Sequence, residues 1–180
     1  MTRIVGTFGF ICGVVLAAFM IATLPFLDNV GDKGALIGYA GMVAAFLLIY
    51  FGVRTYRDNA LGGTIGFGRA FGAGILIAAI ASVCYVATWE VIYYKFMPNT
   101  YTKYAQSAVD DARKSGKSEA EVAKVRSDMD QMLKRVENPL FVTVMTFAEP
   151  FPVGVVIALV SAGVLRRKRR DEDETVLAVA

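Results

Sequence analysis

The residue best placed to do chemistry is a carboxylic acid within an apolar stretch. Glu149 lies ten residues into residues 139–165, where it is the only charged residue. At 1.5 Å per helical residue it would lie about 15 Å deep, near the middle of a bilayer. A charge at that depth costs about 2.5–3.5 kcal/mol. Because the apolar stretches hold no Lys or Arg, we expect Glu149 to be neutral at pH 7, or to face water or a bound cation.

The neighbours of Glu149 add oxygen atoms and interrupt a helix. Thr146 lies three residues before it, which would place both side chains on one helix face. Pro150 and Pro152 lack a backbone N–H and therefore free the carbonyls four residues before them. The sequence up to Gly154 thus predicts a broken or kinked helix, with Pro150, Pro152 and Gly154 as the kink residues. In transporters, such broken helices hold protons or hard cations.

Three interpretations of this segment stay open. In the first, a protonated Glu149 would donate to a freed carbonyl, stabilise the kink and have a purely structural role. Alternatively, Glu149 and Thr146 would form a proton or ion site, or they would line a pocket for a small substrate. A single hydroxyl is little support for a cation site, which favours the first interpretation.

Glu90 is the second acid near an apolar stretch and a further candidate for the proton or ion site. It directly follows Trp89 and precedes Tyr93 near the end of the third stretch. Such a residue reaches lipid headgroups or water, and this is the interpretation that we favour. A direct pairing with the deeper Glu149 would be strained.

The sequence offers little else for catalysis. It has no His, and no Ser, Cys or Asp has the spacing of a nucleophile and its base. Cys12 and Cys84 lie in separate apolar stretches and are interpreted as packing residues. We therefore expect no enzyme, no cofactor and no resident metal, and nothing indicates nucleic-acid binding.

The elements that carry these residues are predicted by the distribution of charge. The chain has 180 residues, of which 56% are hydrophobic and 19% charged, against about 45–50% and 25% in soluble domains. Residues 4–27, 35–53 and 70–89 contain no charge, and with residues 139–165 they make up half of the chain. Each is long enough to cross a bilayer. We predict an all-α membrane protein with four transmembrane helices, the first of them retained and not cleaved as a signal peptide.

The polar residues 99–138 predict an extramembrane helical hairpin between the third and fourth helices. Gly116 is expected to end its first helix, and Ser118 with Glu121 forms a capping-box pattern that opens the second. The first helix has a recurring stripe of Tyr101, Tyr104, Ala105, Ala108 and Ala112. The second has a seam of Val122, Val125, Met129, Met132 and Val136. This seam would pack on the protein itself, bind a second copy, or bind another protein; we favour the first.

The predicted organisation has four parts. Residues 1–98 hold the first three helices, 99–138 the hairpin, 139–170 the fourth helix with a basic anchor, and 171–180 a tail. Short turns join the helices, including one over residues 28–34. The pairs Gly9–Gly13, Gly34–Gly38 and Gly68–Gly72 have close-packing spacing, so we expect them to pack helices within the bundle, with dimerisation as the alternative.

Basic residues predict the orientation. Arg3, Arg54, Arg57, Arg69 and residues 166–170 fall on one side of a four-helix topology, and this side should be cytoplasmic. Residues 95–138 also carry nine Lys or Arg, so the decision rests on the contiguous block 166–170, interpreted as a stop-transfer anchor. Both termini would then be cytoplasmic and the hairpin outside.

Two groups of short motifs resemble those of one known family. The first consists of Tyr56-Arg57-Asp58, Gly62-Gly63 and Phe67-Gly68-Arg69-Ala70-Phe71. The second consists of Asn138-Pro139, Met145-Thr146-Phe147-Ala148-Glu149-Pro150 and Pro152-Val153-Gly154. These motifs resemble the bacterial inner-membrane family catalogued as domain of unknown function 4199. The resemblance runs from the second helix through the basic block and implies a small four-span inner-membrane protein of no established activity. We expect a structural or accessory role for it. The alternative is a small proton- or cation-coupled carrier or channel centred on Glu149.

Overall fold

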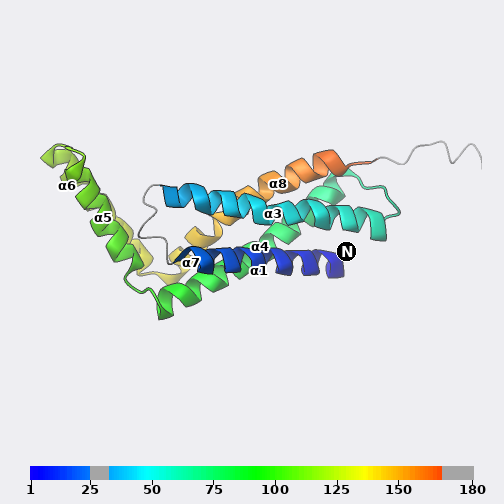
Figure 1. The fold of residues 1–180 in the computed structure, drawn as a ribbon, viewed down its shortest axis with the longest axis horizontal. Helices are drawn as coiled ribbons and strands as arrows, with labels where there is room; N and C mark the ends of the chain where they lie inside the picture. Colours follow the sequence, from blue (N-terminus) through cyan, green and yellow to red (C-terminus); the bar gives the residue numbers. More distant parts are fainter. Residues whose placement is uncertain (25–32, 168–180) are drawn as a thin grey trace, which may run out of the picture. The chain divides into compact units, whose positions relative to one another are not determined.

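The computed structural model describes residues 1–24 and 33–167, and these residues form helices (Figure 1). The helices are α1 (Thr2–Thr23), α3 (Lys33–Ala60), α4 (Phe67–Lys95), α5 (Thr100–Lys114), α6 (Glu119–Val136), α7 (Pro139–Phe147) and α8 (Pro150–Leu165). Within the described residues, extended pairing is limited to one isolated bridge between Ile65 and Arg167. The predicted all-α fold is confirmed. Most of the predicted turn at 28–34 lies outside the described residues. The basic residues 168–170 and the tail 171–180 lie wholly outside them.

Four helical segments are long and apolar enough to cross a membrane, as predicted. They are Thr2–Thr23, Leu36–Ala60, Phe67–Lys95 and Pro139–Leu165. The shortest has 22 residues, which corresponds to about 33 Å of helix against a hydrocarbon core of about 30 Å. The second helix extends beyond its uncharged stretch to Ala60, and Arg54 and Asp58 form an i,i+4 ion pair on this extension (3.7 Å). It ends before Gly62 and Gly63, whose positive φ angles of 63° and 85° turn the chain.

The chain divides into two compact units. The first comprises Met1–Tyr85 together with the described chain from Glu149 onward, and the second comprises Val86–Ala148. Helix α4 contributes its first part to the first unit and its last part to the second.

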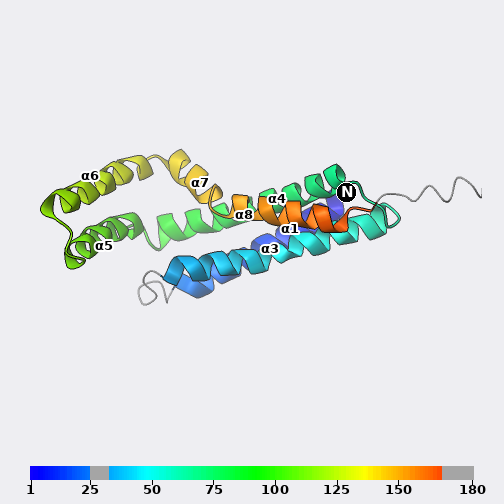
Figure 2. The same ribbon diagram turned by 90° about the horizontal axis from the view of Figure 1, so that it is seen from above.

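The first unit is a helical bundle with an apolar core. Helices α1, α3, α8 and the first part of α4 lie alongside one another in both ribbon views (Figures 1 and 2). Phe46, Leu16, Ile49 and Ile77 are its largest fully buried side chains. Ser82 and Ser161 are the buried polar side chains recorded among the described residues of this unit.

Glycines bring the helices of the first unit into close contact. A Cβ added at Gly9 would lie 2.8 Å from Ile80 Cβ, and one at Gly13 would lie 2.5 Å from Cys84 Cβ. The predicted role of the Gly9–Gly13 pair in packing within the bundle is confirmed. For the other two pairs it is wrong where the structure describes them, because Gly38, Gly68 and Gly72 have open space around an added Cβ. These residues lie near helix ends, where no neighbouring backbone approaches. Further close contacts occur at Gly41, Gly52, Gly74 and Gly154.

The second unit contains the predicted hairpin helices. Helices α5 and α6 pack against each other, joined by a turn in which Gly116 has a φ of 73°. Both hydrogen bonds of the predicted capping box are present: the Ser118 side chain accepts from the Glu121 N–H, and the Glu121 side chain accepts from the Ser118 N–H. Of the recurring stripe on the first hairpin helix, Ala105 and Ala112 are buried and Tyr104 is 59% exposed, and Val109 is buried as well. Helix α5 has its buried face along 105, 109 and 112, and Tyr104 points away from it.

Candidate functional site

The helix around Glu149 is interrupted, and the break precedes the prolines. Helix α7 ends at Phe147, and Ala148 closes it by donating its N–H to the Val144 carbonyl (2.9 Å). Helix α8 begins at Pro150, a position where the missing N–H is tolerated. Glu149 therefore stands between two helices, and it does not belong to the helix that carries Thr146.

The three predicted kink residues all lie inside α8. Pro150 and Pro152 occupy its first turn, with Pro150 buried and Pro152 exposed. Gly154 lies where the helix continues without interruption. A Cβ added there would lie 2.7 Å from Ala78 Cβ and 3.3 Å from the Phe46 ring. The structure thus makes Gly154 a close-packing residue rather than part of a kink.

Glu149 has a tyrosine as its hydrogen-bond partner. The Tyr85 hydroxyl donates to Glu149 Oε2 at 3.1 Å, and both residues belong to the first unit. The Glu149 side chain lies on the protein surface, whereas Tyr85 is half-buried. A phenol can donate to a carboxyl oxygen whether the acid is ionised or neutral. The pair can therefore hold Glu149 in place without a cation.

Glu90 is paired with Thr143 inside the second unit. The Thr143 hydroxyl lies 2.8 Å from Glu90 Oε1 and 3.0 Å from the Pro139 carbonyl oxygen. A hydroxyl has one hydrogen and can donate to only one of these acceptors. The Thr143 hydroxyl therefore donates to one of these two oxygens at a time. The contact joins the last part of α4 to α7 within the second unit.

Thr146 is 5% exposed and lies in the second unit.

The two hydroxyl partners of the acids were missed by the sequence interpretation. Tyr85 is 64 residues from Glu149, and Thr143 is 53 residues from Glu90. Pairing at such separations depends on the register between two helices, which a single sequence does not encode. The hydroxyl of Tyr85 within an apolar stretch is only a weak signal, because Ser82 and Thr88 carry hydroxyl groups in the same stretch.

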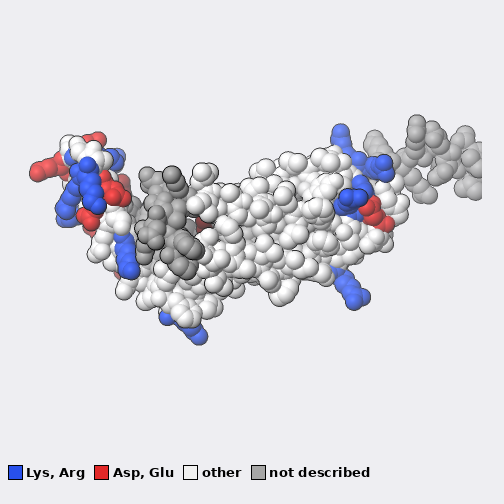
Figure 3. Space-filling view, in the orientation of Figure 1, with Lys and Arg blue, Asp and Glu red and all other residues white. Residues whose placement is uncertain are grey.

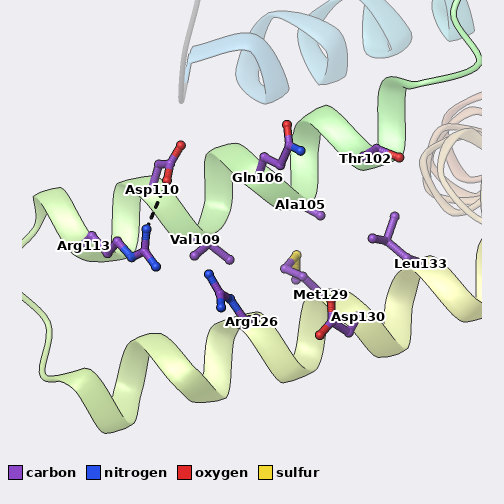
Figure 4. A pocket seen from close by; sticks show the side chains of 10 residues that line it. All are labelled: Thr102, Ala105, Gln106, Val109, Asp110, Arg113, Arg126, Met129, Asp130 and Leu133. Atoms are coloured by element: carbon purple, nitrogen blue, oxygen red, sulfur yellow. Dashed lines mark ion pairs between the residues drawn. The ribbon is translucent and has the colours of Figure 1, made fainter.

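The hairpin contains a surface groove between α5 and α6 (Figure 4). Its volume is about 490 Å³. Ala105, Val109, Met129 and Leu133 give it apolar walls, and Arg113, Arg126, Asp110 and Asp130 lie around them. Arg113 and Asp110 form an ion pair at 4.0 Å. Charges of both signs leave no net preference for a charged ligand.

The four long apolar helices are consistent with the class of helical membrane proteins that cross the bilayer several times. The chain belongs to the family described as Protein of unknown function (DUF4199), which matches residues 7–167. This match confirms the resemblance seen in the sequence motifs and extends it over the first helix and the hairpin. No curated protein and no solved structure was found to match the chain.

Proposed function

We propose that this chain is an integral protein of a bacterial inner membrane with a structural or accessory role and no catalytic activity. The observation that carries the proposal is the packing of the first unit. Its helices meet through Gly9, Gly13 and Gly154, and its buried residues are apolar apart from two serines in the described part. Such a bundle suits a rigid scaffold, because a transport path needs polar groups along its length.

The proposed orientation places both termini in the cytoplasm and the α5–α6 hairpin outside. It is supported by the gathering of arginines at the end of the first unit that holds the N-terminus, the α3–α4 turn and the end of α8 (Figure 3). Single cysteines at Asn59 and at Ser115, in a chain with Cys12 and Cys84 replaced by Ala, test this orientation. A membrane-impermeant maleimide applied to spheroplasts should label position 115 and spare position 59. The reverse pattern would invert the topology.

The hairpin is the proposed site of contact with other proteins, if the accessory role requires one. Its seam residues Val122, Val125 and Met132 are half-buried, Val136 is buried, and Met129 lines the groove that faces α5. This supports the interpretation that the seam serves packing within the hairpin. Self-association or partner binding would then use the remaining surface of the hairpin.

A second candidate function is a small proton- or cation-coupled carrier or channel centred on Glu149. The surface position of Glu149 at a helix break, next to the Tyr85 hydroxyl, favours it. Proteoliposomes loaded with a pH-sensitive dye distinguish the two functions. Our proposal expects the same proton and cation flux as in protein-free vesicles. Flux that Glu149→Gln abolishes, and that the control Glu119→Gln on the hairpin leaves intact, would establish the second function.

A further inference from the structure

Among the described residues, one end of the first unit carries an excess of positive charge. The start of α1, the α3–α4 turn and the end of α8 lie together there in both ribbon views, and basic side chains gather there in the space-filling view (Figures 1, 2 and 3). The described charged residues of these segments comprise six arginines and one acid, namely Arg3, Arg54, Arg57, Arg69, Arg166, Arg167 and Asp58.

The one acid is already engaged by two of the arginines. Arg57 holds Asp58 with two hydrogen bonds, from Nε at 2.6 Å and from Nη2 at 3.2 Å. Arg54 Nε lies 3.7 Å from the same carboxylate. No acid among the described residues forms an ion pair with the remaining four arginines. We call these four, Arg3, Arg69, Arg166 and Arg167, the arginine cluster.

Backbone pairing holds part of the arginine cluster in place. The N–H of Ile65 donates to the Arg167 carbonyl at 3.1 Å, and the N–H of Arg167 donates to the Ile65 carbonyl at 3.0 Å. Gly63 donates its N–H to the carbonyl of Arg57 at 3.0 Å, which ties the same turn to α3. Arg166 and Arg167 are thereby fixed beside the turn that leads to Arg69. The fold therefore holds the backbone of these two residues in a defined position.

Exposed aromatic rings adjoin the arginine cluster. Phe67 is 43% exposed at the start of α4, two residues before Arg69, and stacks on Phe71. Phe51 is 51% exposed and lies three residues before Arg54 in α3. Aromatic rings flanked by basic residues mark the boundary between hydrocarbon and headgroups. The arginines then lie at the level of the lipid phosphates.

We propose that the arginine cluster binds the phosphate groups of anionic phospholipids. The guanidinium group matches phosphate oxygens with two parallel hydrogen bonds. No described acid forms an ion pair with these four side chains, and Asp58 acts on Arg167 only at longer range. A basic residue near an anionic leaflet strengthens association by about fivefold. The inference rests on the part of the proposed function that places the four helices in a bilayer, and it is independent of the role of Glu149.

The test uses the full chain reconstituted into phosphatidylcholine vesicles that carry spin-labelled phosphatidylglycerol or spin-labelled phosphatidylcholine. The immobilised fraction of each label gives their relative affinity. We expect wild type to prefer phosphatidylglycerol by about fivefold or more. The variant R3Q/R69Q/R166Q/R167Q should lose this preference, and replacement of the same four residues by Lys should retain most of it. The control K103Q/K114Q/K117Q/K124Q removes equal charge from the hairpin region and should behave as wild type.

Several outcomes would overturn the inference. These are an absent preference in wild type, an unchanged preference in the fourfold Arg→Gln variant, and an equal loss in the lysine control. Release of the lipid by inorganic phosphate at constant ionic strength would assign the cluster to free phosphate instead. If the Arg→Gln variant does not fold, added salt applied to wild type gives the same test, because screening must remove the preference. Wild type that fails to float with the vesicles would contradict the bilayer placement itself.

Discussion

The Tyr85 hydroxyl donates a 3.1 Å hydrogen bond to Glu149 Oε2 and so joins helix α4 to the residue that precedes α8. This contact gives the acid within the fourth apolar segment a neutral partner. A hydrogen bond from a phenol to a carboxyl group at a helix break can stabilise the contact between two helices. The structural interpretation of Glu149 thereby acquires a specific geometry, although its hydrogen bond goes to Tyr85 and not to a carbonyl freed by proline.

Replacing Tyr85 by Phe removes this hydrogen bond and keeps the ring. Interhelical hydrogen bonds in membrane proteins contribute about 0.6 kcal/mol on average, so we expect a loss of stability of about that size. Unfolding of the purified protein by SDS in mixed micelles measures it. Tyr94→Phe, on the same helix at a position 50% exposed, is the control and should have no effect. Equal effects of the two substitutions would contradict the role of the Tyr85 hydroxyl.

The close contact of α1 with α4 predicts that the effect of a Gly→Ala substitution on stability depends on its position in α1. Gly13→Ala would place a methyl group 2.5 Å from Cys84 Cβ, and such overpacking costs about 1–3 kcal/mol. Gly6→Ala on the same helix meets nothing within 4 Å and should be neutral or slightly stabilising. The thermal midpoint in detergent distinguishes them. A Gly13→Ala protein as stable as Gly6→Ala would mean that α1 does not pack on α4 through this residue.

Gly154 tests whether α8 needs a close contact or a flexible point. Ala at this position would lie 2.7 Å from Ala78 Cβ, so we expect destabilisation by about 1–3 kcal/mol. The matched control is Gly163→Ala in the same helix, where an added Cβ has open space. The compensating pair Gly154→Ala with Ala78→Gly should recover stability, because the removed methyl group makes room for the new one. Failure of this rescue would favour a conformational role for Gly154.

The fold follows from the sequence wherever the signal is local. Uncharged stretches predict the four long helices, and Ser118, Glu121 and Gly116 mark the helix ends of the hairpin correctly. Of the three predicted glycine pairs, only Gly9 and Gly13 make the expected close contacts between helices, and their spacing falls well within a helix. The same spacing at Gly68 and Gly72 has no neighbour, because spacing alone does not reveal which helix face is covered.

The candidate site was predicted less well than the fold. The acids and the interruption near Glu149 stand out in the sequence because charge and proline are rare in apolar stretches. Their hydroxyl partners, Tyr85 and Thr143, depend on which turns of two helices face each other. That register is set by side-chain packing over the whole interface. No local pattern of residues records it.

The capping box of α6 predicts a pH-dependent helix start. The Ser118 hydroxyl and N–H donate to the Glu121 carboxylate at 2.7 and 2.9 Å, and these hydrogen bonds lower the pKa of Glu121. A carboxyl group whose pKa is lower in the folded state stabilises the fold at pH values above its pKa in the unfolded chain, which is about 4.3. This stabilisation is lost as pH falls through the folded-state pKa. Amide hydrogen exchange at the start of α6 should therefore accelerate, relative to the intrinsic rate, on acidification.

Two variants check this assignment. Ser118→Ala should destabilise the start of α6 by about 1 kcal/mol and weaken its response to acid. Glu121→Gln keeps a capping side chain without a charge and should remove the response. An unchanged acid response in Glu121→Gln would assign the effect to another carboxyl group.

The measurement that most directly tests the structural role of Glu149 is the thermal stability of wild type and Glu149→Gln in detergent. It is made across pH 5–9 and with different cations. Gln keeps an oxygen that accepts the Tyr85 hydrogen bond and carries no charge. Our account therefore predicts similar midpoints and the same response to pH and cations in both proteins. A wild-type midpoint that falls with rising pH, or rises with one cation, while Glu149→Gln shows neither change, would contradict it and establish a titratable or ion-binding site.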